Sequence, residues 1–120
     1  MSTVLLVEDN EKNMKLLRDV LTAKGYRVLE ATSGEEAVEL TLADRPELVL
    51  MDVQLPGIDG VEALRRVRAD PRTAGISVLA LTAQAMDGDR ERFLAAGFDG
   101  YLSKPVDILE LLATVAGYLP

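Results

Sequence analysis

Residues 48–57 read LVLMDVQLPG, and the fold is best predicted by working outward from them. Four consecutive apolar residues run directly into one carboxylate, Asp52, and the run is bounded by Pro46 on one side and by Pro56 and Gly57 on the other. A short continuous apolar run of this kind is typical of a strand that is buried on both faces. Asp52 is therefore expected at the end of a buried strand, where the core meets water.

The composition excludes several classes of function. The chain has 120 residues, of which 48% are hydrophobic, so it can bury one sizeable core and is not expected to be disordered. It contains no histidine and no cysteine, which excludes a Ser-His-Asp triad, a Cys-His pair, a thiolate or imidazole zinc site and a disulfide framework. Any metal must be held by oxygen ligands, which favours Mg²⁺ or Ca²⁺.

Net charge and hydropathy limit the classes of partner and the cellular location that the sequence predicts. The net charge of −7 argues against nucleic acid or an anionic membrane as the main partner. The first apolar run, Val4–Val7, is too short for a signal-peptide core or a membrane span. We therefore expect a cytoplasmic domain over residues 1–120, without an effector domain.

Apolar runs alternate with helical patterns along the whole chain. The predicted strands are Val4–Val7, Arg27–Ala31, Leu48–Met51, Ile76–Leu81 and Gly100–Ser103. Each is followed by a predicted helix, with N-terminal caps at Asn10, Ser33, Asp59 and Asp107 and with Asp87–Ala96 as the fourth helix. Strict alternation of strands and helices predicts a parallel sheet with helices on both faces. The expected fold class is α/β, a single doubly wound five-stranded sheet.

Polar residues follow four of the predicted strands. Glu8 and Asp9 follow the first strand, Asp52 the third, Thr82 the fourth and Lys104 the fifth. Because parallel strands end at the same edge of a sheet, three carboxylates, one hydroxyl and one ammonium should converge there. Clustered carboxylates repel one another, and Mg²⁺ relieves the repulsion. One cation and one lysine leave room for a phosphoryl group, which a carboxylate can attack in line.

These residues lie in motifs that resemble the response-regulator receiver domains, the CheY-like family. In chain order the motifs are Val7-Glu8-Asp9-Asn10, Leu50-Met51-Asp52, Leu55-Pro56-Gly57, Leu81-Thr82-Ala83 and Lys104-Pro105. Each motif is weak alone, but the five occur in order at family-like spacing, and the resemblance covers essentially the whole chain. The strand order 2-1-3-4-5 of a flavodoxin-like, CheY-like sheet is taken from this family and does not follow from the sequence pattern.

The resemblance implies a phospho-acceptor rather than an enzyme. By position, Asp52 would accept the phosphoryl group from a histidine kinase or a histidine phosphotransfer protein. Asp9 and Asp52 would ligate Mg²⁺ directly together with the main-chain carbonyl of Gln54, and Glu8 would act mostly through a bound water. Mn²⁺ is an alternative ion for the same ligands.

The remaining family positions imply how phosphorylation would be read out. Thr82 and Lys104 would contact the phosphoryl group, and Ala83 would keep its approach open. Thr82 would move together with a switch aromatic, Tyr101, and the Lys104-Pro105 peptide bond would be cis. The face formed by residues 87–97, 100–103 and 107–119 would then change its affinity for a protein target. A monomer is expected, and dimerisation on activation is left open.

One position departs from the commonest family pattern. Many members carry aspartate where this chain has Glu8, which adds a methylene and affects the geometry of metal ligation. The Glu-Asp-Asn opening resembles stand-alone DivK-like regulators of the cell cycle or of polarity. Gln54 and Gln84 lie beside the expected site and are candidates for setting the lifetime of the phosphoryl group.

Other interpretations of the same residues exist. Asp9 and Asn10 are common as helix caps, Thr82 as a strand end, Lys104 as a solvated lysine and Tyr101 as a packing residue. A buried carboxylate at Asp52 without a function would cost free energy, so a purely structural role is disfavoured there.

Two alternative functions are considered. A phosphorylation-independent scaffold would typically have lost an acid, the threonine or the lysine, and this chain keeps them all. A small aspartate-nucleophile phosphohydrolase usually carries a second acid two residues after the nucleophile, where this chain has Gln54.

Overall fold

The sheet has five strands joined by helices throughout. The structure, a computed structural model, describes residues 2–83 and 89–119. Its strands are β1 (Thr3–Val7), β2 (Arg27–Ala31), β3 (Leu48–Asp52), β4 (Ser77–Thr82) and β5 (Gly100–Ser103). Its helices are α1 (Glu11–Ala23), α2 (Gly34–Asp44), α3 (Gly60–Ala69), α4 (Asp89–Ala96) and α5 (Ile108–Tyr118). The predicted alternation of strands and helices is confirmed.

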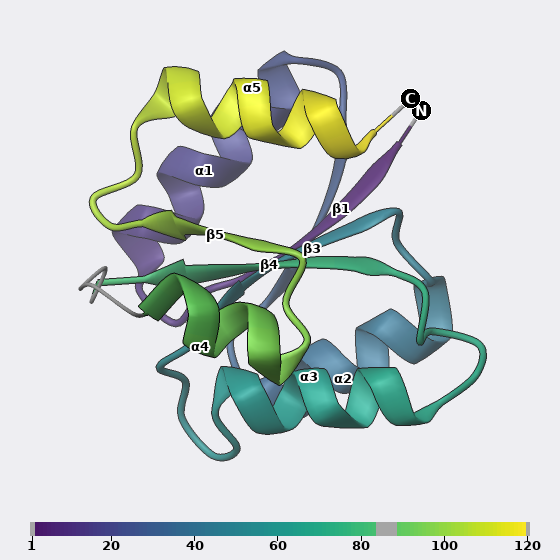
Figure 1. Cartoon of the computed structure of the whole chain (residues 1–120). Helices are drawn as coiled ribbons and strands as arrows, with labels where there is room; N and C mark the ends of the chain where they lie inside the picture. Colours follow the sequence, from purple (N-terminus) through teal and green to yellow (C-terminus); the bar gives the residue numbers. More distant parts are fainter. Residues whose placement is uncertain (1, 84–88, 120) are drawn as a thin grey trace.

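All neighbouring strands are parallel, and their order is β2-β1-β3-β4-β5. Helices α1 and α5 cover one face of this sheet, and α2, α3 and α4 cover the other (Figure 1). The doubly wound α/β class is therefore confirmed, and so is the order 2-1-3-4-5. This order places β3 in the centre of the sheet, with β1 and β4 beside it.

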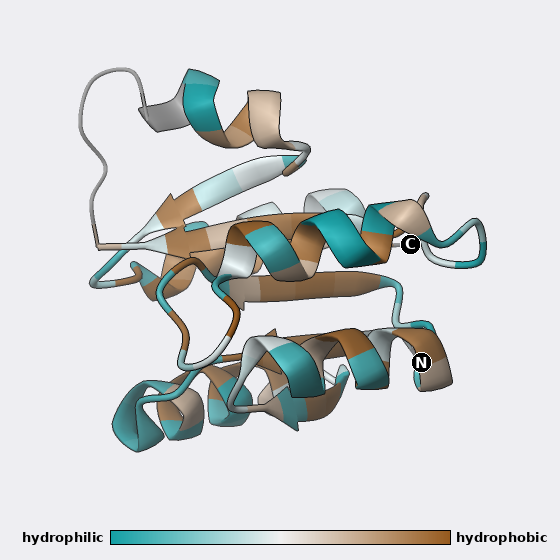
Figure 2. Ribbon diagram, turned by 90° about the horizontal axis from the view of Figure 1, so that it is seen from below, coloured by the Kyte–Doolittle hydropathy of each residue, from teal (hydrophilic) through white to brown (hydrophobic). Residues whose placement is uncertain are grey.

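The core consists of two apolar layers, one on each face of the sheet. Successive residues of a strand point into the two layers in turn. Val4 and Leu6 of β1 pack toward α1 and α5, whereas Leu5 and Val7 pack toward α2 and α3. All five residues of β3 are buried, as predicted for a strand covered on both faces. Figure 2 shows the hydrophobic colour concentrated on the strands and on one side of each of several helices. The centre of the sheet is thus a rigid base for the residues at its edge.

The helix ends follow from local sequence chemistry. Four predicted N-caps accept a hydrogen bond from the backbone N–H three residues later, namely Asn10, Ser33, Asp59 and Asp107. Gly25 and Gly97 take left-handed φ angles of 91° and 111° just after α1 and α4, as a glycine after a helix C-terminus does. These residues fix where four of the helices begin and where α1 and α4 end.

Small differences from the predicted boundaries occur at the functional edge. β3 includes Asp52 and β4 includes Thr82, so both residues are the last of their strands instead of the first beyond them. Val53 N–H donates to Leu81 O over 3.0 Å, which extends the pairing of β3 with β4 through Asp52, and Lys104 N–H donates to Thr82 O over 2.7 Å, which extends the pairing of β4 with β5 through Thr82. Asp87, the first residue of the predicted fourth helix, and the glutamine at position 84 lie outside the described residues. None of the helices in residues 2–83 and 89–119 has the length and apolarity needed to cross a membrane.

Candidate functional site

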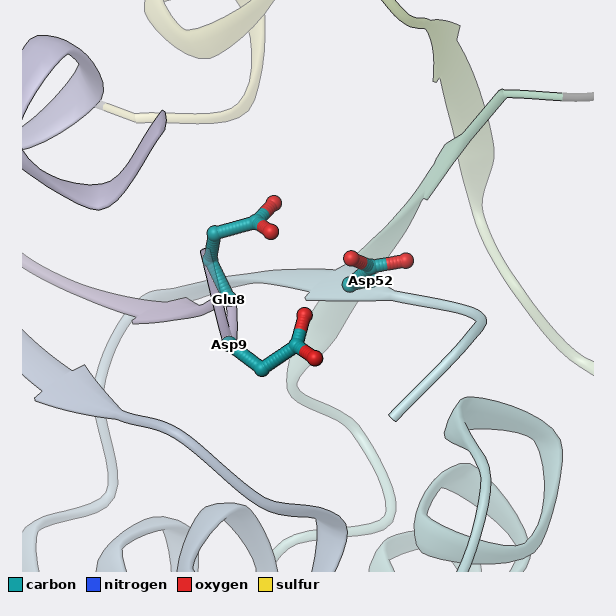
Figure 3. Close-up of side chains that lie close together, drawn as sticks. All are labelled: Glu8, Asp9 and Asp52. Atoms are coloured by element: carbon teal, nitrogen blue, oxygen red, sulfur yellow. The ribbon is translucent and has the colours of Figure 1, made fainter. Parts of the chain in front are cut away.

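Three carboxylates meet at the carboxyl edge of the sheet. Glu8 and Asp9 directly follow β1, and Asp52 ends β3, the strand that pairs with β1. One carboxylate oxygen from each residue lies within 4.8 Å of one from each of the other two. Figure 3 shows the three side chains gathered at the ends of these neighbouring strands. The predicted acidic cluster is therefore present in the structure.

Lys104 joins the cluster from β5. Its Nζ atom lies 2.6 Å from Asp52 Oδ2 and 2.7 Å from Glu8 Oε2. Its backbone N–H donates to Thr82 O over 2.7 Å, which fixes the start of the connection after β5. The ammonium group of Lys104 thus contacts residues that lie 52 and 96 positions before it in the chain.

Burial strengthens the electrostatic interactions within this charge cluster. Glu8 and Asp52 are only 1% and 5% exposed, whereas Asp9 is exposed to solvent. Burial raises the pKa of the Glu8 carboxyl, the Asp52 charge raises it further, and Lys104 partly offsets both effects. Burial acts to lower the pKa of Lys104, but the ion pairs of its ammonium with Asp52 and Glu8 outweigh burial and raise this pKa. Lys104 is therefore a fixed cation at neutral pH.

Backbone groups orient the Asp52 carboxylate. The Gln54 N–H donates to Asp52 Oδ1 over 3.0 Å, while Oδ2 faces Lys104. Glu8 is held in a comparable way, because Asn10 N–H donates to its Oε1 atom over 3.2 Å. The peptide of Gln54 therefore lies beside the Asp52 carboxylate, and the side chain of Gln54 is exposed.

The other predicted site residues divide into two groups. Thr82 is 5% exposed, ends the strand beside β3, and lies in register with Ser103, so it belongs to the same edge as the carboxylates. Ala83 follows it and is exposed. The Lys104-Pro105 peptide bond is cis. Tyr101 lies further back on β5, in register with Ala80, and is not among the residues of the carboxylate cluster.

Tyr101 belongs to a surface region behind the site. Its ring centroid lies 6.2 Å from that of Phe93 in α4, with the planes tilted by 45°. It is half-buried and lines a shallow depression together with Leu94 and Tyr118. The structure thus places Tyr101 between α4 and the exposed side of α5. Of the two predicted switch residues, Thr82 lies at the acidic edge and Tyr101 does not.

The oxygen ligands fit a hard divalent cation. Glu8 Oε2 is buried and, within the described residues, has no partner in hydrogen-bond geometry, although the Lys104 ammonium lies close to it. Two of the three acids, Glu8 and Asp52, pair with Lys104, and the three carboxylates outnumber its single positive charge. Carboxylate oxygens in this number, with water completing the shell, are what Mg²⁺ binds in proteins.

A small cavity beside the site was not expected from the sequence. Its volume is about 80 Å³, and its lining joins Glu8 and Lys104 to Asn13, Leu16 and Pro105. Leu16 is 50% exposed and lies off the buried stripe of α1. Helical periodicity could not identify Leu16 as a cavity residue, because that pattern only separates buried positions from exposed ones.

The fold and the site together define a class of protein. A family model described as the response regulator receiver domain matches residues 4–116. The chain belongs to the response regulator receiver domain family, whose members are phospho-acceptor switches of two-component signalling and not enzymes in the usual sense. The family resemblance predicted from the motifs is confirmed.

Within this family the chain is similar to DivK. It is 43% identical over 117 residues to the polar-differentiation response regulator DivK of Brucella anthropi, which covers 98% of this chain and 95% of DivK. The DivK-like resemblance inferred from the Glu-Asp-Asn opening is thus supported at the level of the whole sequence.

The fold of this chain closely matches solved structures of receiver domains. The receiver domain of a sensor histidine kinase from Pseudomonas aeruginosa, with a magnesium ion coordinated in its active-site cleft, is 38% identical with a TM-score of 0.90, over 98% of this chain and 96% of that one. The receiver domain of Ssk1 from Saccharomyces cerevisiae was solved together with the histidine phosphotransfer protein Ypd1. For this comparison the identity is 30% and the TM-score 0.91, over 98% of this chain and 88% of that one.

Proposed function

We propose that Asp52 of this chain accepts a phosphoryl group from a histidine kinase or a histidine phosphotransfer protein. The observation that carries this proposal is the position of the Asp52 carboxylate, which is 5% exposed at the end of the central strand and lies 2.6 Å from the Lys104 ammonium. A carboxylate so placed is held in one orientation and is still reachable from outside. The phosphohistidine must be supplied by another protein, since this chain contains no histidine.

The proposed metal ligands are the carboxylates of Asp9 and Asp52 and the main-chain carbonyl of Gln54, with Glu8 acting through a water molecule. The clustering of the three acids supports this assignment. When bound, Mg²⁺ would neutralise charge on the phosphoryl oxygens. Mn²⁺ prefers the same oxygen ligands and is the alternative ion.

The chain's own residues perform the transfer. An oxygen of Asp52 forms the new bond to phosphorus, while the bond from phosphorus to the donor's imidazole nitrogen breaks and its electron pair stays on that nitrogen. Lys104 compensates negative charge on the phosphoryl oxygens, and the Thr82 hydroxyl donates to one of them. Ala83, small and exposed, leaves the approach open.

Phosphorylation at the acidic edge would change the protein surface around β5. Movement of Thr82 toward the phosphoryl group would repack Tyr101, and the two states would differ in affinity for a target protein. The proposed target surface is formed by α4, β5 and α5, where Leu94, Leu109 and Tyr118 are 41%, 79% and 38% exposed. We infer a monomer in the unphosphorylated state, with dimerisation on activation left to experiment.

The similarity to DivK extends the proposal to the biological setting. A polarity or cell-cycle role, exerted in the cytoplasm through protein contacts and without nucleic acid or a membrane as partner, is the setting proposed here. The acidic net charge of −7 supports the protein partner over the other two.

The test is labelling by a small acyl phosphate, read as intact mass. The wild-type chain should gain one phosphoryl group in the presence of Mg²⁺ and none after chelation, and Asp52→Asn should gain none. Asp19→Asn is the matched control, because Asp19 is an exposed aspartate of α1 that pairs with two surface cations, Lys15 and Arg18. Stoichiometric labelling of Asp52→Asn would refute the assignment.

A further inference from the structure

The backbone behind Asp52 packs against the first residue of α3. A Cβ atom built on Gly60 would lie 2.5 Å from Asp52 O and 2.9 Å from Val53 Cα. Both neighbours are backbone atoms, which cannot rotate aside as the end of a flexible side chain can. Gly60 N–H also donates to Val53 O over 2.9 Å. The end of β3 and the start of α3 therefore meet backbone to backbone, at a position that requires glycine.

A second contact holds the same connection from α2. A Cβ atom on Gly34 would overlap the carbonyl oxygen of Ile58. Ile58 N–H faces both carboxylate oxygens of Glu35, at 3.4 Å each. Gly57 turns the chain at this point with a φ of 75°. Residues 53–59 connect β3 to α3, and their second half is thus fixed by α2 at Ile58 and by the contact at Gly60 that follows.

This connection carries groups that the site depends on. Val53 N–H donates to Leu81 O over 3.0 Å, and Gln54 N–H donates to Asp52 Oδ1 over 3.0 Å. The orientation of the Asp52 carboxylate is therefore tied to the path of the backbone through Gln54. A displacement at Gly60 would move the Asp52 peptide and the Gln54 peptide together, because both lie within a few bonds of the contact.

We propose that Gly60 is a positioning residue for the metal site, setting the placement of the Asp52 carboxylate and the Gln54 carbonyl. Gly34 supports the same placement from α2. Since Asp52 and Gln54 are metal ligands only in the function proposed above, this role rests on that function. Groups that orient metal ligands typically contribute about 10–100-fold to metal affinity. A methyl group at Gly60 should therefore act on Mg²⁺ binding and not only on stability.

The test measures Mg²⁺ binding in the absence of any phosphodonor, by titration followed through backbone amide chemical shifts. Gly60→Ala should weaken Mg²⁺ binding by about tenfold or more. It should also shift the amide signals of residues 52–58 in the metal-free protein. The matched control is Gly117→Ala in α5, where an added Cβ atom meets nothing within 4 Å.

A second control separates positioning from loss of stability. Val115→Ala removes buried methyl groups from the α1–α5 layer of the core, away from residues 53–60. It should lower the free energy of unfolding and leave Mg²⁺ affinity unchanged. If Gly60→Ala binds Mg²⁺ as the wild type does, or if Val115→Ala loses the same affinity, the positioning role is refuted.

Gly34→Ala decides the question if Gly60→Ala does not fold, since it acts on the same connection from another helix. Weaker Mg²⁺ binding by Gly34→Ala would support the proposal, and wild-type binding would refute it. Failure of the proposed function has a different result. In that case the wild-type chain itself would not bind Mg²⁺ and would not be labelled.

Discussion

At the scale of single residues, the proposed phosphoryl transfer depends most on Asp52 and Lys104. Asp52 is buried at the end of a strand covered on both faces, and an unpaired charge there would be costly. Lys104 compensates it at 2.6 Å and pairs with Glu8 at 2.7 Å. An incoming phosphoryl group would bring new negative charge to an ammonium that is already in place, so little reorganisation is needed.

The Thr82 hydroxyl gives the first prediction. A hydrogen bond to a charged group contributes about 1.5–3 kcal/mol, so Thr82→Ala should slow labelling of Asp52 by on the order of tenfold to a hundredfold. Thr82→Ser keeps the hydroxyl and should retain most of the rate. The rates are measured by intact mass against time at a fixed concentration of acyl phosphate. Equal rates for Thr82→Ala and the wild type would show that this hydroxyl does not contact the phosphoryl group.

At the scale of elements, Arg68 connects α3 to two other parts of the fold. Its guanidinium donates to Ala74 O over 2.9 Å, to Ile76 O, to Gly97 O over 3.0 Å and to Asp99 Oδ2 over 2.8 Å. Asp99 Oδ2 in turn accepts from Val78 N–H over 2.8 Å. One side chain thus ties the end of α3 to the entry of β4 and to the connection between α4 and β5.

The second prediction concerns this connection. Arg68→Lys should lower the free energy of unfolding by about 2 kcal/mol, because an ammonium cannot reproduce the planar fork and several acceptors lose their donor. Urea unfolding at pH 7 measures the loss. Arg66→Lys is the control, since Arg66 is an exposed residue of the same helix that pairs with Glu62. A loss at Arg68 no larger than at Arg66 would contradict the account.

The third prediction concerns pH and α3. Glu62 bonds to Arg65 and Arg66, which lowers the pKa of its carboxyl from 4.5 to about 2. A carboxyl with a depressed pKa in the folded state stabilises it above the unfolded pKa, and the contribution is lost as the pH falls from about 4.5 through 2. Glu62→Gln should therefore reduce stability at pH 7 and make no difference at the acid end of this range.

This pH effect is measured by urea unfolding of both proteins at low ionic strength. The Glu62 side chain is partly exposed on the surface of α3, so added salt should diminish the difference. A difference between wild type and Glu62→Gln that is as large at pH 2 as at pH 7 would show that the ion pairs are not its cause.

At the scale of the whole molecule, the parallel sheet brings distant residues to one edge. Much of this was predictable from local patterns, because buried strands and capped helices are encoded by neighbouring residues. The predicted strand at Gly100–Ser103 and the cap at Asp107 are examples that agree with the structure. The convergence of Glu8, Asp52 and Lys104 followed from the topology of parallel strands alone.

Other features could not be predicted, because they depend on contacts between segments distant in sequence. The strand order came from the family resemblance, since pairing of β1 with both β2 and β3 leaves no local signal. The close approach of Gly60 to Asp52 and the four acceptors of Arg68 are tertiary contacts. A glycine or an arginine at such positions looks ordinary in the sequence.

The fourth prediction is that Mg²⁺ stabilises the whole molecule. A ligand that binds only the folded state at a hundred times its dissociation constant adds about 2.7 kcal/mol to the free energy of unfolding. Unfolding with and without Mg²⁺ should show this gain for the wild type and lose it for Asp9→Asn. NaCl at matched ionic strength is the control for screening. An equal gain from NaCl would mean that no specific site is filled.

The position of the phosphoryl group in the labelled protein decides whether Asp52 is the phospho-acceptor. Reduction of an aspartyl phosphate with borohydride converts that aspartate to homoserine, which peptide mass spectrometry can place in the sequence. Homoserine is expected at position 52 after labelling in the presence of Mg²⁺. Homoserine at position 9, or at any other aspartate with Asp52 unmodified, would contradict it.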